Sequence, residues 1–294
     1  MLRKQLKRSG CLIFAACLLF LTLGRASAAE TLGLNEELLR GCDINGSTNT
    51  ETSLGDVTAD AAAALGAADI ALLPSGDFGT NLQPGPVTED ALAASLQKDS
   101  ELAVTDLTGR QLWMMLEHGL SHITVGEDAL IDTEGSRFDG YLQISGLKIV
   151  YDASAPTGER LIDVQLTDGT PIRQEEETTA YRVVSTTDIW QGGYGYPTVP
   201  ADRLERIGTE RDALRAVLVR QGSLSVPEGG RVEVRGTRDW IQSRQPVAVI
   251  LLIVVCLIVG MVRKRNQKID LWHSSETATK EEIEQALPAQ AEQS

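Results

Sequence analysis

Two histidines, His118 and His122, form the pair of residues most suggestive of metal chemistry. A spacing of four residues places both imidazoles on one face of a helix, where they could ligate zinc. The residues between them are Gly119, Leu120 and Ser121, so no glutamate base lies between the two ligands. A two-metal phosphoesterase site needs more His, Asp and Asn ligands than this pair supplies. We therefore predict no metal site, and expect both side chains to hydrogen-bond near a helix C-terminus.

Other catalytic patterns are absent from the sequence. It contains no Gly-Lys-Ser/Thr phosphate loop, no Gly-x-Ser-x-Gly elbow and no dinucleotide-binding fingerprint. Asp43 and Asp56 are single carboxylates in a polar stretch, and nothing in the sequence pairs them as an acid and a base. We predict no catalytic residue and no cofactor.

The acidity of the chain limits its partners. The 294 residues carry a formal net charge of −14. Nucleic acid and anionic lipid are themselves negatively charged, so we expect neither as a ligand of the extracellular region. Acidity is also a general solubility device, and it identifies no partner by itself.

The N-terminus has the pattern of a secretory signal peptide. The apolar run Cys11–Leu23 follows a cluster of cations and precedes Ala26-Ser27-Ala28, a small-x-small cleavage site. We therefore predict a signal peptide over residues 1–28. Cys42 would then be the only cysteine outside the membrane, either as a small buried residue or in an intermolecular bridge.

A second hydrophobic segment, Val247–Val262, carries no charge and is followed by Arg263-Lys264-Arg265. This pattern predicts a transmembrane helix over residues 247–262, with a buried core helix as the alternative. Cations concentrate on the cytoplasmic side of membrane helices, so residues 263–294 would form a cytoplasmic tail. We expect a single-pass protein of a bacterial cell membrane, with residues 236–246 as a linker outside it.

The region between these segments alternates helix-like and strand-like runs. Helices are expected over residues 56–65, 89–96, 110–120 and 210–220, with Thr52 or Ser53, Thr88, Thr108 and Thr209 as their caps. Strands are expected over residues 69–73, 102–107, 141–151, 161–166, 181–185 and 231–234. This order predicts an α/β (mixed α+β) domain over residues 31–235, with a largely buried mixed sheet covered by helices.

Gly146 lies within the run predicted as a central strand, residues 141–151. A glycine inside an apolar strand has no propensity reason to be there. We therefore expect the backbone at Gly146 to be crowded by a neighbouring element.

Four stretches, in order, resemble the C-terminal substrate-specificity domain of the 5'-nucleotidase family. The family patterns are E-T-x-L-G-N-x-x-A-D-A, A-D-I-A-x-x-N-G-G-G-I-R, F-L-Q-V-S-G-L…V-Y-D and x-F-L-A-x-G-G-D-G-F. They are similar to Glu51–Ala61, Ala68–Gly79, Tyr141–Asp152 and Asp188–Tyr196. The resemblance implies a mixed α/β fold that follows a two-metal metallophosphatase domain in full-length relatives. We expect a stand-alone domain that lacks this catalytic half.

The resemblance places several of the family's ligand-binding positions on residues of other types. The Asn and Arg of the N-G-G-G-I-R loop fall on Pro74 and Gly79, and a further Arg falls on Thr50. The first of two base-stacking aromatics falls within Gln97–Ser100, which holds no aromatic residue. Guanidinium groups are natural partners of phosphate, so the implied ligand is neutral or weakly charged.

The second aromatic of the family is retained as Tyr196, according to the resemblance. Glycine-broken loops that follow strands also present crevices in α/β domains. The predicted ligand-binding residues are therefore Tyr196, Tyr194, Trp190, Ser75, Gly76, Asp77 and Phe78. The alternative for the two tyrosines is a packed turn.

Three functions follow as hypotheses. The first is a non-catalytic binding or interaction module, with a nucleoside, a sugar or a protein side chain as ligand. The second is the substrate-binding half of a split nucleotidase, completed by a separate metallophosphatase chain. The third, a self-sufficient hydrolase, requires metal ligands that the sequence does not supply.

Overall fold

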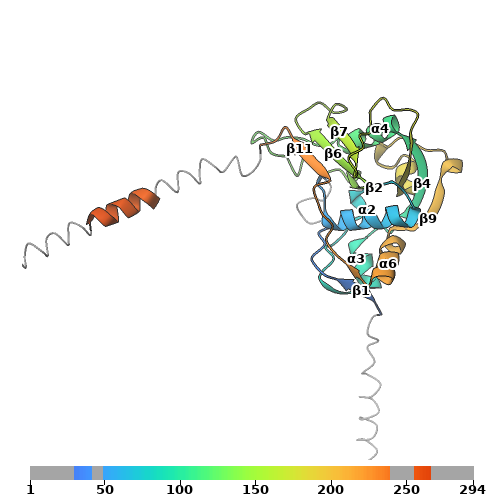
Figure 1. The fold of residues 1–294 in the computed structure, drawn as a ribbon, viewed down its shortest axis with the longest axis horizontal. Helices are drawn as coiled ribbons and strands as arrows, with labels where there is room; N and C mark the ends of the chain where they lie inside the picture. The colour runs from blue at the N-terminus through green and yellow to red at the C-terminus, as the bar shows by residue number, and fades with distance from the viewer. Residues whose placement is uncertain (1–29, 42–48, 239–254, 266–294) are drawn as a thin grey trace, which may run out of the picture. The chain divides into compact units, whose positions relative to one another are not determined.

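The computed structural model describes residues 30–41, 49–238 and 255–265 (Figure 1). The chain divides into two compact units, residues 1–237 and residues 238–294. Of the elements formed by the described residues, the first unit holds the strands and all helices but one, and the candidate site lies within it.

In the second unit, residues 255–265 form a helix. No helix among the described residues is long and apolar enough to cross a membrane. The other part of the predicted span at 247–262 lies outside the described residues, as do the predicted signal peptide and Cys42.

The first unit is built around a five-stranded sheet with the strand order β5-β2-β8-β4-β9 (Figure 1). The strands are β2 (Ile70–Pro74), β4 (Glu101–Thr108), β5 (Leu142–Ser145), β8 (Ala180–Thr186) and β9 (Glu205–Thr209). β2 and β8 run parallel, whereas the other neighbouring pairs run antiparallel. The sheet is therefore mixed, which confirms the predicted fold class.

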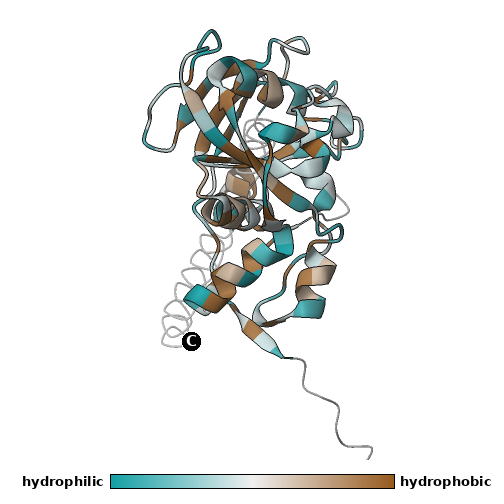
Figure 2. Ribbon diagram, turned by 90° about the vertical axis from the view of Figure 1, so that its right-hand side faces the viewer, coloured by the Kyte–Doolittle hydropathy of each residue, from teal (hydrophilic) through white to brown (hydrophobic). Residues whose placement is uncertain are grey.

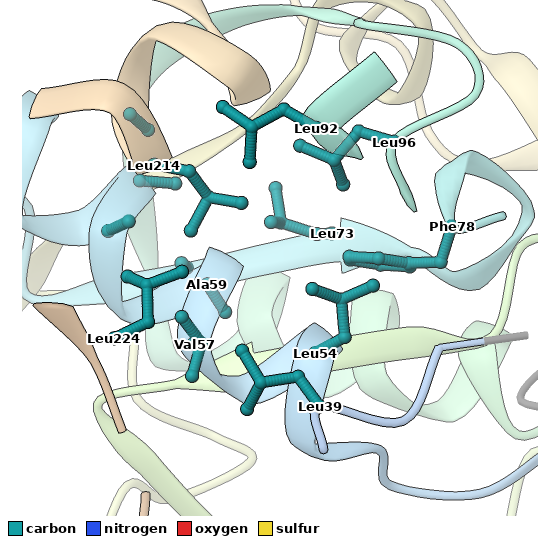
Figure 3. Packing of buried hydrophobic residues seen from close by; sticks show 14 of the residues in the cluster. Leu39, Leu54, Val57, Ala59, Leu73, Phe78, Leu92, Leu96, Leu214 and Leu224 are labelled. Carbon is teal, nitrogen blue, oxygen red and sulfur yellow. The ribbon is translucent and has the colours of Figure 1, made fainter. Parts of the chain in front are cut away.

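Helices cover both faces of this sheet. α2 (Ser53–Gly66), α3 (Glu89–Ser95) and α6 (Glu210–Gln221) pack on one face, and α4 (Gly109–Gly119) and the short α5 (Thr187–Trp190) pack on the other. β2 is buried on both faces: Ala71 and Leu73 point to the first layer, and Ile70 and Leu72 point to the second. Figure 2 shows hydrophobic residues concentrated on the interior strands, and Figure 3 shows Leu73 beside side chains of the first layer.

Threonines begin the longer helices, as predicted. Thr52, Thr88, Thr108 and Thr209 each accept a hydrogen bond from a backbone N–H of the first turn. This contact satisfies one of the N–H groups that have no partner within the helix. Of the two candidate caps for α2, the structure selects Thr52, and the helix ends where Ala67 adopts a left-handed φ of 44°.

The prediction of one central strand over residues 141–151 is wrong. The segment forms two strands, β5 and β6 (Leu147–Asp152), which belong to different sheets, and β5 lies at a sheet edge. Gly146 turns the chain between them with φ of +78°. The expected crowding at Gly146 is confirmed, because an added Cβ would collide with the carbonyl oxygen of Asp69.

Two three-stranded sheets complete the unit, in the orders β10-β1-β3 and β11-β6-β7. The new strands are β1 (Thr31–Asn35), β3 (Gly85–Thr88), β7 (Leu161–Leu166), β10 (Ser223–Leu224) and β11 (Val232–Arg235). β7 and β11 were expected from the sequence, whereas β1, β3, β9 and β10 were not. Hydrophobic alternation could not reveal them, since β1 has a single buried residue and β9 has none.

Candidate functional site

The loop after β2 is held by main-chain contacts. Its short 3-10 helix, η2 (Ser75–Asp77), places the N–H of Ser75 2.7 Å from the carbonyl oxygen of Tyr141 and the N–H of Gly76 2.8 Å from that of Asp139. A Cβ at Gly76 would lie 2.6 Å from Cβ of Asp139 and 3.1 Å from the hydroxyl of Tyr194. A glycine is therefore required where this loop approaches Asp139 and Tyr194.

Asp77 is the charged residue of this loop, and it is only 2% exposed. Lys98 Nζ lies 3.2 Å from its Oδ1, and the hydroxyl of Ser100 donates to its Oδ2. Burial raises the pKa of Asp77, and the contacts from Ser100 and Lys98 oppose that rise. Both carboxylate oxygens of Asp77 thus have partners from within the chain.

The turn after α5 brings Tyr194 to the same place. Gly192 adopts φ of 91°, and Tyr194 itself adopts φ of 55°, a left-handed conformation that is uncommon for a residue with a side chain. The Tyr194 ring is half-buried, and its hydroxyl contacts Lys98 Nζ, which lies 5.0 Å from the ring centroid. Lys98 therefore bridges Asp77 and Tyr194, and we call these three residues the loop–turn junction.

The other predicted ligand-binding residues are buried. Tyr196 is 3% exposed, and its hydroxyl donates to the carbonyl oxygen of Gly140 at 2.7 Å. Trp190 is fully buried, and its Nε1 donates to the carbonyl oxygen of Ala103 at 2.8 Å. Phe78 is also fully buried, within the layer drawn in Figure 3. The aromatic ring of the predicted set that reaches the surface therefore belongs to Tyr194.

Ser75 supports the loop from beneath. Its hydroxyl accepts a hydrogen bond from Nε2 of Gln143 at 3.0 Å, and the same amide nitrogen donates to the carbonyl oxygen of Thr50 at 2.8 Å. Oε1 of Gln143 accepts from the N–H of Thr52 at 2.9 Å. This side chain thus joins the start of α2 to the loop that carries Asp77.

The two histidines lie beside the turn. Nε2 of His118 lies 2.9 Å from the carbonyl oxygen of Tyr194, and its ring meets the edge of Tyr196 at 4.4 Å between centroids. His122 stacks on Phe138 at 4.3 Å. Within the described residues, no group of three or more His, Cys, Asp or Glu side chains could hold a metal ion. The His118 ring contacts the carbonyl of a distant turn, whereas we expected it to contact those of its own helix.

Lys98 was not predicted as a site residue. The alignment with the family placed Gln97–Ser100 at a missing aromatic ring, and this gave no reason to expect a cation there. Nothing in the neighbouring sequence distinguishes Lys98 from an ordinary surface lysine. Its partners Asp77 and Tyr194 are distant in sequence, so sequence spacing could not identify them.

Comparison with known sequences gives a consistent result. A model of the 5'-nucleotidase C-terminal domain family matches residues 25–201. A trifunctional nucleotide phosphoesterase of Bacillus subtilis is 27% identical over 152 residues, which are 50% of this chain and 10% of that protein. A 5'-nucleotidase-related protein of Glossina morsitans morsitans is 32% identical over 174 residues, 57% of this chain and 29% of that protein. The chain therefore matches less than a third of the length of either relative.

Comparison with solved structures shows the same fold. A 5'-nucleotidase precursor from Thermus thermophilus superposes with a TM-score of 0.60 at 23% identity, covering 79% of this chain and 43% of that one. The NAD nucleotidase of Haemophilus influenzae superposes with a TM-score of 0.55 at 16% identity, covering 72% and 39%. In both cases the similarity spans less than half of the larger protein.

Proposed function

Because the chain belongs to the 5'-nucleotidase C-terminal domain family, we propose that it is a non-catalytic binding or interaction module at the outer face of a membrane. The observation that supports this proposal is the loop–turn junction. Lys98 lies 3.2 Å from the buried carboxylate of Asp77 and contacts Tyr194. The cation at this position is therefore engaged within the chain, and an anionic ligand would have to compete with Asp77 for it.

The ligand we propose is neutral or weakly charged: a nucleoside, a sugar or a side chain of a partner protein. The half-buried ring of Tyr194 offers one face for stacking. Aromatic stacking contributes about 0.5–1.5 kcal/mol beyond area burial. Asp188, which is exposed beside the turn, could accept hydrogen bonds from hydroxyl groups of such a ligand.

The test is a calorimetric titration of adenosine and adenosine monophosphate against the full-length protein in detergent. We expect adenosine to bind no more weakly than the monophosphate. Tyr194→Ala should weaken adenosine binding by about tenfold, whereas Tyr194→Phe, which keeps the ring, should retain it. A clear preference for the monophosphate, or binding unchanged in Tyr194→Ala, would contradict the proposal.

A second candidate is the substrate-binding half of a split nucleotidase. It is favoured by the coverage of the 5'-nucleotidase precursor from Thermus thermophilus, of which this chain spans 43%. A separate metallophosphatase chain would supply the metals and the hydrolysis. Under either proposal, the purified protein alone should not hydrolyse nucleotide monophosphates with manganese, cobalt or zinc. Turnover lost in a His118→Ala/His122→Ala variant would show that the chain is itself a hydrolase.

The membrane location is a further part of the proposal. It rests on the apolar segments and cation clusters of the sequence, which would place residues 29–245 outside and residues 263–294 in the cytoplasm. Protease added to intact cells should digest the outer domain and leave a tag at Ser294 intact. Loss of that tag in intact cells would contradict this topology.

A further inference from the structure

We propose that a cavity between the start of α2 and the C-terminal segment of the first unit binds a small organic cation. Its volume is about 370 Å³. It shares no residue with the loop–turn junction, so the proposal is independent of the function proposed above. We call it the carboxyl cavity. It is lined by residues 49–53, Asp56, Ile131, Tyr141, Tyr151, Val226, Pro227, Gly229, Gly230, Val232 and Val234.

Two buried polar groups in the wall of the cavity have no hydrogen-bond partner. Oδ1 of Asp56 accepts no hydrogen bond although this side chain is nearly fully buried, and the hydroxyl of Tyr151 has no partner although Tyr151 is fully buried. Buried polar groups in folded proteins are almost always paired. The Asp56 carboxyl also shares a hydrogen bond with Glu51, so what remains unsatisfied is its Oδ1 and the hydroxyl of Tyr151. A ligand that supplies hydrogen-bond donors could satisfy both atoms.

Glu51 is positioned at the cavity by the backbone of the C-terminal segment. Its carboxylate accepts from the N–H groups of Gly230 at 2.9 Å, Arg231 at 3.2 Å and Val232 at 3.2 Å. These contacts hold the carboxylate in place without neutralising its charge. Glu51 thus contributes a fixed negative charge beside Asp56.

Arg231 lies beside Asp56 and Asp60, and it is already engaged. Its guanidinium makes a bidentate contact to Asp60 at 2.9 and 2.7 Å and donates to the carbonyl oxygen of Ile144 at 2.7 Å. Its Nε lies 3.6 Å from Oδ1 of Asp56, too far for a hydrogen bond. Asp60 occupies this guanidinium and is not among the residues that line the cavity. Glu51 and Asp56 are therefore the carboxyl groups of the cavity, and the described residues that line it include no cation.

The rest of the wall favours a carbon skeleton rather than a bare ion. Val226, Pro227, Val232 and Val234 line the cavity together with Ile131. A volume of about 370 Å³ far exceeds that of one water molecule, roughly 30 Å³ in the liquid. The chemistry that fits is an alkyl chain that ends in an ammonium group, with the ammonium toward Asp56 and Glu51.

Such a ligand would release a proton on binding. Burial raises the pKa of Asp56 to about 8, and the positive charge of Arg231 opposes the rise. The negative charge of Glu51, the hydrogen bond between Glu51 and Asp56, and the charge of Asp60 add to it. Tyr141 and Tyr151, the tyrosines that line the cavity with Asp56, stay neutral, because burial raises the pKa of Tyr141 well above its usual range and that of Tyr151 to about 12. A bound cation favours the ionised form of Asp56, so binding at pH 7 should expel its proton. A neutral ligand would expel none.

The experiment titrates n-butylammonium, n-butanol and butyrate into the full-length protein by calorimetry. Buffers of different ionisation enthalpy report the protons released. We expect n-butylammonium to bind at least tenfold more tightly than n-butanol, and butyrate not to bind. Release should approach one proton per ligand at pH 7 and fall toward zero at pH 9.5. No binding of n-butylammonium, equal affinity for n-butanol, or no proton release at pH 7 would overturn the proposal.

Variants locate the site. Asp56→Asn should weaken binding of n-butylammonium at least tenfold and abolish proton release. Tyr151→Phe removes only the unpaired hydroxyl and should weaken binding several-fold with the fold intact. Glu127→Gln removes an exposed carboxylate elsewhere in the domain and should change neither quantity. Unchanged binding in folded Tyr151→Phe together with unchanged binding in Asp56→Asn would place any amine binding outside this cavity.

Discussion

The loop–turn junction and the carboxyl cavity are each built around a buried aspartate, and both carboxyl groups are 2% exposed. Burial raises the pKa of both. Asp77 has an ammonium at 3.2 Å and the hydroxyl of Ser100, whereas Oδ1 of Asp56 accepts no hydrogen bond and has a guanidinium only at 3.6 Å. A buried charge is tolerated when it is paired and hydrogen-bonded. Equal burial thus leaves both oxygens of Asp77 with partners from the chain, whereas Oδ1 of Asp56 remains without a hydrogen bond.

The largest expected effect on stability comes from a substitution that disturbs both regions at once. Gly146 joins β5, which carries Gln143 beneath Ser75, to β6, which carries Tyr151. Gly146→Val combines a collision with the Asp69 carbonyl and a left-handed φ of +78°. We expect the free energy of unfolding to fall by about 2–5 kcal/mol, from overpacking and backbone strain together. Chemical denaturation of the purified protein measures it.

Gly169→Val is the matched control for that substitution. Gly169 has a similar φ of +87°, but an added Cβ meets nothing within 4 Å. In this variant the free energy of unfolding should therefore fall by only about 1–2 kcal/mol, the cost of the strained left-handed backbone. Equal losses in the two variants would mean that the close approach to Asp69 has no energetic role.

Removing Lys98, the cation of the loop–turn junction, should leave Asp77 incompletely paired, as Asp56 is at the carboxyl cavity. In Lys98→Ala, the buried carboxylate of Asp77 keeps Ser100 but loses its ammonium. We expect a loss of about 1–3 kcal/mol at pH 7, since an incompletely paired buried group retains its desolvation penalty. The loss should be smaller at pH 4.5, where Asp77 can take up a proton. Thermal unfolding at the two pH values measures both.

The double variant Lys98→Ala/Asp77→Asn tests whether the unpaired carboxylate of Asp77 causes the loss of stability. It should recover part of the lost stability, because no unpaired carboxylate remains. As an exposed reference, Arg110→Ala breaks an ion pair with Glu177 in which both side chains are more than half exposed, and it should have almost no effect. A loss in Arg110→Ala as large as that in Lys98→Ala would show that burial of Asp77 does not matter.

The stability that Asp56 contributes at the carboxyl cavity should change with pH in the opposite sense from that of a carboxylate in an ordinary ion pair. The folded pKa of Asp56 is about 8, above its ordinary value of 3.8, so the folded protein holds a proton that the unfolded chain releases between these values. The contribution of Asp56 to stability is therefore full below about pH 4 and is lost as pH rises through 8. Asp56→Asn should remove this decline and gain about 2 kcal/mol on the wild type between pH 5 and 6.5, from about 1.4 kcal/mol per pH unit. Parallel pH profiles for the two proteins would contradict this assignment.

The smallest effect concerns the hydroxyl of Tyr194. Tyr194→Phe removes its contact with Lys98 and leaves the ion pair to Asp77 and the ring in place. Because the contact is partly exposed to solvent, we expect a loss of about 0.5–1 kcal/mol, comparable to one hydrogen bond. A loss of stability greater than that of Lys98→Ala would show that the tyrosine hydroxyl, rather than the ion pair, makes the larger contribution to this junction.

Local features of the fold could be predicted from the sequence. The threonine caps at Thr88, Thr108 and Thr209 each act on residues within one turn, so the nearby sequence is sufficient to identify them. The buried strand at 69–73 was evident as a short apolar run that ends at Pro74 and Gly76. The family resemblance likewise depends on contiguous motifs, and it predicted a mixed α/β fold.

Contacts between distant segments were decided only by the tertiary structure. Asp56 was seen in the sequence as an isolated carboxylate, and folding places it beside Glu51, Tyr151 and Arg231. Tyr196, expected at a ligand site, packs in the core with its hydroxyl on a carbonyl oxygen. The physical reason is that the state of a buried polar group depends on partners up to about 180 residues away, as for Glu51 and Arg231. Periodicity and spacing report which residues are near in the chain, whereas pairing, burial and pKa depend on which are near in space.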